Sequence, residues 1–402
     1  MFKTVYYSSK MCYTAYSDNT LLAGNKMSLV SIRKTEDYRQ ETVDAAIARH
    51  FDALGVEKDL RPGMKVTLKP NLLTARRPEQ AVTTHPSVLL AVAKWLRERG
   101  IEEITVADSP GGPYVTAALR TVYSVSGLRA LEGPYRLNYD TGFKEIRCPE
   151  GFVNRSFNII NPLAEADYII NIAKLKTHGM TTLSAGIKNL FGAIPGLQKP
   201  EFHYKYPELR AFSNMLLELA ATVGPDVTVI DAVEAMEGNG PNAGDMRYMG
   251  LTLASRDVYA QDYVAAKLMG LEPESIAMLK IALEKGLISP EEIELAGDKV
   301  QPPETPFKLP DSATLDFMSF VPKLFREPAR RIMSNFLRPL PKLEREKCIG
   351  CGKCAESCPP HIIKITGGKA VFPTEGCISC FCCQEMCPVH AIKVKRKLRR
   401  SK

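Results

Sequence analysis

The sequence predicts an α/β fold, a mostly parallel sheet with flanking helices over residues 28–300, followed by a small α+β domain over residues 342–394. Two observations predict this division. Short apolar runs alternate with amphipathic helical patterns from Ser28 to about Val300, as they do where helices cover a parallel sheet. Eight of the eleven cysteines then form two copies of one pattern between residues 348 and 387.

The elements of the large domain follow from the spacing of apolar residues. Residues 42–54 place apolar side chains on one helical face together with His50, which we therefore expect in the core. A helix is expected to begin at Pro86, which suits a first helical turn, and to end by Gly100. Short apolar runs predict four strands, at residues 66–68, 104–107, 168–172 and 227–230.

Polar residues follow the carboxyl end of each predicted strand. Because ligands of open α/β sheets bind at these ends, the four positions are expected to line one crevice. The competing interpretation is that each residue is an ordinary solvent-facing loop residue. We expect substrate contacts from Lys69, Asn71, Asp108, Ser109, Lys174 and Lys176, and a catalytic role for Asp231.

The segment 174–196 is the richest in polar side chains of this kind. It places two lysines and His178 before a predicted helix N-terminus, where unpaired amides favour an anion. We expect Asn189 to bind a carboxylate or phosphate, and His178 and Lys188 to be catalytic, with the histidine as acid, base or metal ligand. The alternative is that Lys176 and Lys188 are solvated and that His178 caps a helix.

A loop rich in glycine, Met236–Asp245, is expected to act as a lid that brings Glu237 and Asn239 to the site. Its glycines lack the spacing of a dinucleotide-binding fingerprint, and the chain contains no P-loop motif. The sequence therefore predicts neither of these nucleotide sites.

The cysteine pattern C-x2-C-x2-C-x3-C-P occurs twice, at an offset of 29 residues that continues into Pro-x-His-x-Ile. This is the spacing of proteins with two [4Fe-4S] clusters, in which the fourth cysteine of each run ligates the other cluster. The offset indicates an internal duplication. We expect one cluster on Cys348, Cys351, Cys354 and Cys387, and a second cluster on Cys377, Cys380, Cys383 and Cys358.

Other uses of these cysteines fit less well. Structural zinc usually takes two separated CxxC pairs for each ion. A disulfide framework is typical of small secreted domains, whereas residues 1–27 lack a signal-peptide pattern. Cys382 is expected to pack beside a cluster without binding it, and Cys12 and Cys148 are expected to be ordinary thiols.

The remaining segments predict connections and tails. Residues 1–27 predict a poorly ordered extension, and residues 301–341, with eight prolines, predict a linker whose amphipathic helix docks the small domain or, less favourably, a membrane surface. Residues 395–402 form a basic tail. Because residues 393–402 hold seven basic residues, the rest of the chain has a net charge of only +1, which disfavours a nucleic-acid partner. No membrane span is expected, and oxygen-sensitive clusters favour a reducing cytoplasm.

Five segments of the chain resemble one protein family. The bacterial and archaeal proteins of domain-of-unknown-function family 362, many of which end in a two-cluster ferredoxin module, are similar in VTLKPNLL, VTTHPSVLLAV, ITVADSPGG, ADYIINIAKLKTHGMTTLSAGIKNLFGAIPG and DAVEAMEGNGP. The resemblance covers most of residues 28–270. It implies a cluster-binding protein with a ferredoxin-like second domain, and it assigns no reaction.

Two functions are compatible with these observations. In the first, the α/β domain binds an anionic small molecule or cofactor, and two [4Fe-4S] clusters exchange electrons with it, as in an oxidoreductase. In the second, the protein is an electron-transfer or maturation partner that docks another protein and has no substrate of its own. An electron donor or acceptor protein is expected in both. The large domain with converging polar groups favours the first.

Overall fold

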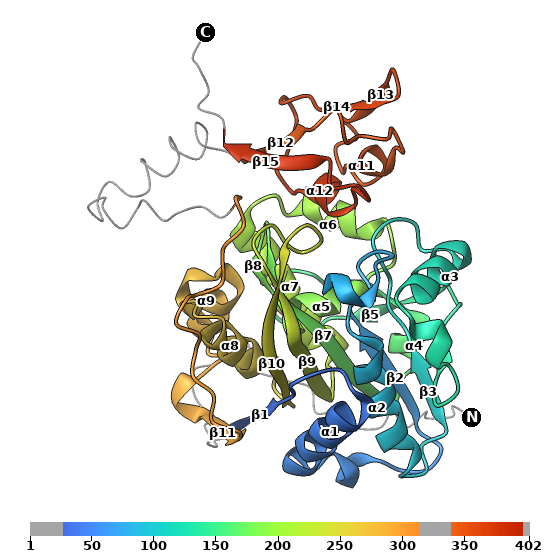
Figure 1. Ribbon diagram of the computed structural model, residues 1–402, viewed down its shortest axis with the longest axis vertical. Coiled ribbons are helices and arrows are strands. Elements are labelled where there is room, and N and C mark those ends of the chain that lie inside the picture. The colour runs from blue at the N-terminus through green and yellow to red at the C-terminus, as the bar shows by residue number, and fades with distance from the viewer. Residues whose placement is uncertain (1–26, 313–338, 397–402) are drawn as a thin grey trace.

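The computed structural model describes residues 27–312 and 339–396. They form a large α/β domain and a small domain that lies against one edge of it (Figure 1). The amphipathic helix predicted within the linker lies outside the described residues, as do residues 1–26 and the tail beyond residue 396. Within the two described ranges, no helix is both long enough and apolar enough to cross a membrane.

A nine-stranded sheet forms the centre of the large domain, in the order β11-β1-β10-β9-β7-β2-β3-β4 with β8 paired to β7. The strands from β9 to β4 are parallel, whereas β10 is antiparallel to both of its neighbours. The predicted α/β class is therefore confirmed. The strands of this domain, including the separate pair β5 and β6, are β1 (Ser28–Lys34), β2 (Lys65–Pro70), β3 (Glu103–Val106), β4 (Arg136–Leu137), β5 (Phe143–Arg147), β6 (Ser156–Ile160), β7 (Tyr168–His178), β8 (Thr182–Ser184), β9 (Val227–Glu237), β10 (Asp245–Ser255) and β11 (Ile293–Gly297).

Helices cover both faces of the sheet (Figure 1). One hydrophobic core lies under α1 and α2, and a second lies under α7, α8 and α9. His50 lies in α1 as expected, fully buried, with both ring nitrogens 2.9 Å from hydroxyl groups. The helices of this domain are α1 (Gln40–Leu54), α2 (Pro86–Arg97), α3 (Thr116–Val125), α4 (Asn161–Ala164), α5 (Gly186–Asn189), α6 (Gln198–Lys205), α7 (Leu209–Val223), α8 (Val258–Leu268) and α9 (Ala277–Glu284).

Strand β7 contributes to both cores and extends further than the sequence predicts. Ile170 and Ile172 pack in one core and Ile169 in the other, because successive side chains of a strand point to opposite faces. The strand does not end at residue 172 but continues to His178, where it turns into a hairpin with β8. Pairing with β9 and then β8 sustains the extra length, with a register shift after Lys174.

The small domain repeats one structural unit twice. Short helices α11 (Lys353–Glu356) and α12 (Cys382–Glu385) occupy equivalent positions, and His361 and His390 both have a left-handed φ of 50°. This agreement supports the internal duplication expected from the sequence. Its strands form the antiparallel pairs β12 (Pro339–Leu343) with β15 (Ile392–Arg396) and β13 (Lys364–Thr366) with β14 (Lys369–Val371).

The second repeat contacts the large domain. Arg76 donates from Nη2 to the carbonyl of Pro388 at 3.1 Å, and Asn242 donates from Nδ2 to the carbonyl of Glu385 at 2.7 Å. Gly111 approaches the sulfur of Met386 so closely that a Cβ at this position would lie only 2.4 Å from it. These contacts place α12 opposite the carboxyl ends of β2, β3 and β7.

Candidate functional site

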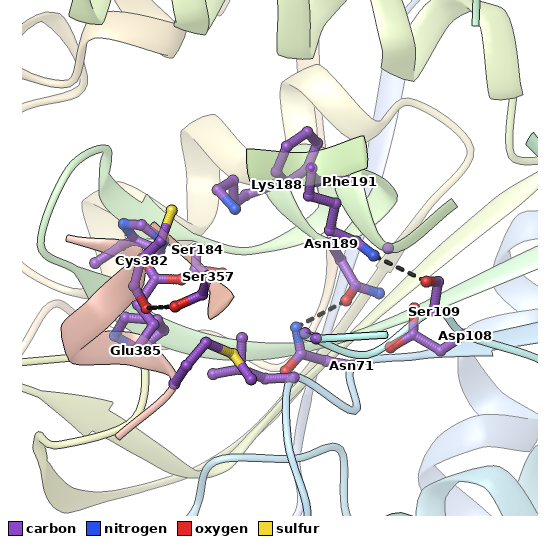
Figure 2. A pocket seen from close by; sticks show the side chains of 18 of the residues that line it. Asn71, Asp108, Ser109, Ser184, Lys188, Asn189, Phe191, Ser357, Cys382 and Glu385 are labelled. Atoms are coloured by element: carbon purple, nitrogen blue, oxygen red, sulfur yellow. Dashed lines mark hydrogen bonds and ion pairs between the residues drawn. The ribbon is translucent and has the colours of Figure 1, made fainter. Parts of the chain in front are cut away.

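A cavity lies between the two domains (Figure 2). Residues at the carboxyl ends of β2, β3 and β7 form one side, and α12 of the small domain forms another. The strand-end crevice expected from the sequence is thus present, and the second domain closes over it. The sequence-predicted residues in its lining are Asn71, Asp108, Ser109, Lys176, His178, Lys188 and Asn189.

Lys176 lies on β7 in the lining of the cavity and is fixed there by hydrogen bonds. Its Nζ donates to Oδ1 of Asn71 at 2.8 Å and to the carbonyl of Val82 at 2.7 Å. Asn71 in turn donates from Nδ2 to Oδ1 of Asn189 at 2.9 Å. Burial, together with neighbouring lysines, lowers the pKa of Lys176 to about 7. All of its protein partners are uncharged, so its positive charge is available to an anion.

His178 is a neutral hydrogen-bond donor that faces the small domain. Its Nδ1 accepts from the amides of Met180 at 3.1 Å and Thr181 at 3.3 Å, so the hydrogen-bond network assigns the proton of the neutral ring to Nε2. Nε2 lies 3.3 Å from Oε1 of Glu385. Burial and the charge of Lys188 hold the pKa of His178 well below its usual range. The ring therefore caps the β7–β8 turn, not a helix, and its Nε2 faces Glu385.

Lys188 projects from α5 over the ring of Phe191, with Nζ 4.7 Å from the ring centroid. Burial lowers its pKa, and the carboxylate of Glu385 opposes this effect. Among the described residues, its Nζ makes no hydrogen bond. Lys188 is therefore the cavity lysine whose charge is least satisfied by the protein.

The anion predicted at the start of the helix in segment 174–196 belongs to the protein itself. The first amides of α5, from Gly186 and Ile187, donate to the two carboxylate oxygens of Asp262 at 2.7 and 2.9 Å. Asp262 lies on α8 and is fully buried. The prediction of a ligand anion at this helix end is wrong, because an internal carboxylate already satisfies these amides.

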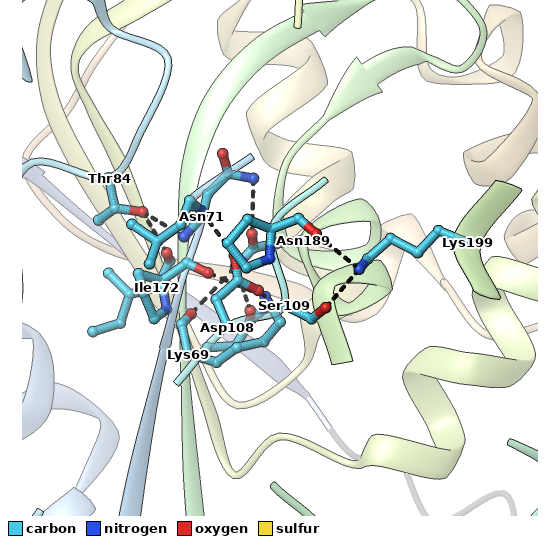
Figure 3. Close-up of polar contacts among 12 residues, drawn as sticks. Lys69, Asn71, Thr84, Asp108, Ser109, Ile172, Asn189 and Lys199 are labelled. Carbon is cyan, nitrogen blue, oxygen red and sulfur yellow. Dashed lines mark hydrogen bonds and ion pairs between the residues drawn. The ribbon is translucent and has the colours of Figure 1, made fainter. Parts of the chain in front are cut away.

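Lys199 enters the cavity from α6, and the sequence did not single it out. Figure 3 shows it reaching Ser109, whose Oγ accepts from its Nζ at 2.9 Å. The amide of Gly196 donates to the same hydroxyl at 2.8 Å. Burial lowers the pKa of Lys199 to about 7. Its partners are also uncharged, so it resembles Lys176 in its electrostatics.

Behind this wall, Lys69 and Asp108 form a buried ion pair with Nζ and Oδ1 2.7 Å apart (Figure 3). The second oxygen of Asp108 accepts from the amide of Leu72 at 2.9 Å. A Cβ on Gly192 would lie 2.0 Å from Asp108 Oδ1, so only glycine fits beside the pair. Lys69 was expected to contact a ligand, but it neutralises Asp108 and lies outside the cavity lining.

Lys174 and Asp231 form a separate network outside the cavity lining. Asp231 accepts from Lys174 Nζ at 3.0 Å, from the Tyr38 hydroxyl at 2.8 Å and from the amide of His85 at 2.9 Å. Its oxygens are thus fully used in joining β9 to two loops. The structure places the predicted catalytic Asp231 in a structural network, directly opposite Lys174 in the pairing of β9 with β7.

Glu237 and Asn239 also lie outside the lining, contrary to expectation. Glu237 accepts from Arg247 at 2.7 Å and from the amide of Lys308 at 3.1 Å. Asn239 exchanges two hydrogen bonds of 2.9 Å with Asp311. Both residues attach the start of the linker to the β9–β10 turn.

The eight repeated cysteines line two smaller cavities, four around each, in the two sets expected from their spacing. Four thiols around one cavity match the ligands of a [4Fe-4S] cube. Amides of Ser379 and Ala391 point at the sulfurs of Cys377 and Cys387, at 3.4 and 3.2 Å, and would stabilise thiolate charge. One cavity is lined by Cys348, Cys351, Cys354 and Cys387, and the other by Cys358, Cys377, Cys380 and Cys383.

Cys382 lies between the second cysteine set and the cavity between the domains. A hydrogen bond with its thiol lowers the pKa of Cys380, and Cys382 itself lines the large cavity (Figure 2). The ligand position Cys383 is the next residue in the chain. A cluster held by this set would therefore sit directly behind the cavity wall.

Sequence reasoning did not single out Lys199 and Glu385 as site residues, although both line the cavity. Lys199 and His203 are four residues apart on α6, and this spacing next to the glycine-rich segment was a usable signal. For Glu385 there was none, because its equivalent in the first repeat, Glu356, is exposed. Glu385 differs from Glu356 only because the docked second repeat brings it to the cavity.

The fold and the two four-cysteine cavities define an iron–sulfur protein with a large α/β domain. Comparison with family models agrees: residues 340–388 match a 4Fe-4S dicluster domain, and residues 66–267 match the domain of unknown function DUF362. The chain belongs to the DUF362 family, as its sequence motifs indicate.

Individual relatives were also found. A thylakoid-associated protein of Synechocystis sp. is 31% identical over 323 residues, which cover 77% of this chain and 96% of the relative. Among solved structures, the lactate racemase apoprotein from Thermoanaerobacterium thermosaccharolyticum matches with a TM-score of 0.32 and 16% identity over 52% of each chain.

Proposed function

We propose that the protein binds an anionic small molecule in the cavity between its domains, and that two [4Fe-4S] clusters exchange electrons with this molecule. One observation carries the proposal: the same cavity is lined by Lys176, Lys188 and Lys199 and by Cys382, the neighbour of the cluster-ligand position Cys383. Charge recognition and a route for electrons thus meet in one cavity.

The residues that line the cavity would have different roles in binding this molecule. Lys176, Lys188 and Lys199 stabilise the negative charge of the ligand, which is strengthened where water is excluded. Asn71 and Asn189 orient it through their amide groups. His178 holds its proton on Nε2, which lies 3.3 Å from Oε1 of Glu385. The bound clusters supply single electrons, and the eight cysteines in their two sets hold them.

A protein partner for electron exchange is favoured by the outer side of the small domain. Cys351 is exposed, whereas the second cysteine set is half-buried or buried, and Ile349 beside it is 64% exposed. We propose that electrons enter or leave through this side. The oxygen sensitivity of such clusters favours a reducing compartment such as the cytoplasm.

The proposal is tested on protein purified without oxygen. We expect eight iron atoms per chain, and a small anion identified by mass spectrometry after release from the protein. Lys188→Met should lose this anion and keep all eight irons, whereas Lys58→Met, which removes an exposed lysine far from the lining, should keep both. An iron content of about two atoms per chain, with zinc present, would contradict the assignment of two [4Fe-4S] clusters.

The same experiment addresses the other function. A protein that carries eight irons but retains no small molecule, and whose Lys188→Met variant behaves as the unaltered protein, would have no ligand in this cavity. That result would favour an electron-transfer or maturation partner that docks another protein.

A further inference from the structure

We infer that the ligand carries two negative charges, and that Lys199 and His203 on α6 bind the part of it that lies opposite β7. This inference deepens the proposed function and rests on it. The ligand class it names is a dicarboxylate or a phosphomonoester dianion.

The charge of the cavity leads to this class. Asp108 is neutralised by Lys69, and His178 is neutral. In the protonated forms that an anion binds, Lys176, Lys188 and Lys199 face a single remaining carboxylate, that of Glu385. In that state, two positive charges among the described lining residues have no counter-ion. Unpaired buried charge is costly, so an anion of matching charge is the complement that such a cavity selects.

His203 indicates where the second part of the ligand lies. Only 3% of the residue is exposed, and it lines the cavity. Its Nδ1 has no hydrogen-bond partner, and neither ring nitrogen bonds to another described residue. A buried polar ring without a partner is a group that a ligand would satisfy.

The ring of His203 is held rigidly in this position. It stacks on Phe212 with centroids 4.3 Å apart and meets Phe191 edge-on at 5.7 Å. Lys199 precedes it by one helical turn on α6, so both side chains extend from the same face. Burial lowers the pKa of His203 to about 3, which keeps the ring neutral as a hydrogen-bonding group beside the lysine.

His178 cannot serve the same purpose in the docked arrangement. Its Nδ1 is taken by two backbone amides and its Nε2 faces Glu385. The two histidines thus have different roles, although sequence reasoning assigned catalysis to His178 alone. His203 is the histidine whose ring is free to contact a ligand.

The test uses the anaerobic holoprotein and three probes: succinate, butyrate and methyl phosphate. Succinate and butyrate have the same carbon number and differ by one carboxylate. We expect succinate or methyl phosphate to bind at least about tenfold more tightly than butyrate in calorimetry. The better of the two identifies the source of the charges as a dicarboxylate or a phosphomonoester.

Variants then locate the second subsite. Lys199→Met and His203→Phe, which retains the aromatic stacking, should each weaken the dianion at least about tenfold and leave butyrate unchanged. Lys205→Met removes an exposed lysine of the same helix and should bind all three probes normally. Failure of succinate and methyl phosphate to exceed butyrate would overturn the inference, as would normal dianion binding in both α6 variants.

Failure of the inference can be told apart from failure of the proposed function. If Lys188→Met weakens all probes equally while dianions show no advantage, an anion site exists but takes one charge. If Lys188→Met changes nothing, the site itself is absent.

Discussion

Nε2 of His178, at the end of β7, lies 3.3 Å from Oε1 of Glu385, on α12 of the small domain. The two residues are 207 positions apart in the sequence, and they join the cavity of one domain to the cluster loop of the other. Glu385 stands between the ligand positions Cys383 and Cys387. An anion that enters the cavity therefore meets a carboxylate that is fixed in the cluster-binding loop.

Glu385→Gln should raise the affinity of the cavity for anions. The glutamate places a negative charge beside Lys188 and Lys176, and it competes with a ligand for them. Removing the charge is expected to tighten binding of butyrate by about tenfold, measured by calorimetry. Glu356→Gln alters the equivalent, exposed residue of the first repeat and serves as the control. Unchanged affinity in Glu385→Gln would show that its carboxylate does not oppose the ligand.

Anion affinity should fall as the pH rises above about 7. Lys176 and Lys199 have pKa values near 7 in the free protein, because burial disfavours their charged forms. An anion binds the protonated lysines, so binding is strongest below this pH and requires proton uptake above it. The affinity should drop by up to about tenfold per pH unit for each lysine. A flat profile between pH 6 and about 9 would contradict these pKa shifts.

The same pKa shifts of Lys176 and Lys199 determine whether folding stability rises or falls with pH. The unfolded lysines retain their protons up to the ordinary value of 10.5, whereas the folded ones lose them near 7. The unfolded state therefore binds more protons between these values. Their contribution to the free energy of unfolding should rise with pH across this range.

Lys69→Met should destabilise the large domain strongly. The change leaves the buried carboxylate of Asp108 without its partner at 2.7 Å, and such losses cost about 3–5 kcal/mol. The free energy of unfolding in denaturant provides the measurement. Arg210→Met breaks an ion pair of 2.6 Å whose side chains are 66% and 41% exposed, and it should change stability little. Equal effects of the two changes would argue against a buried pair.

Cys382 and Cys383 should differ in their effect on iron content. Cys383 belongs to a four-cysteine cavity, whereas Cys382 lines the large cavity. Cys383→Ala is expected to lower iron from eight to about four atoms per chain, and Cys382→Ala to keep eight. The neighbouring positions are matched in burial, so loss of iron in both would indicate that the loop, not ligand identity, controls cluster retention.

Local patterns predicted the parts of the site that depend on strand ends. Asn71, Asp108 and Ser109 follow strands that are parallel neighbours, so their convergence could be foreseen. The pairing of Lys69 with Asp108 could not, because it depends on the distance between two side chains. Spacing alone likewise grouped the cysteines, since each repeat is local.

The predictions that differ from the structure concern residues whose partners lie far away in the sequence. Lys174 and Lys176 look equivalent in the sequence, but Lys174 pairs with Asp231 whereas Lys176 donates to Asn71. The charge at the start of α5 is met by Asp262, 76 residues from Gly186. Glu385 enters the site only because α12 docks against the large domain. None of these contacts leaves a periodic signal in the sequence.

The most direct test of the account asks whether a bound anion lies beside a cluster. Succinate labelled with ¹³C at its carboxylates is added to the reduced, anaerobic protein, and hyperfine coupling between the label and the unpaired cluster spin is measured. The account predicts coupling in the unaltered protein and its loss in Lys188→Met. Bound succinate that shows no coupling to either cluster would contradict it.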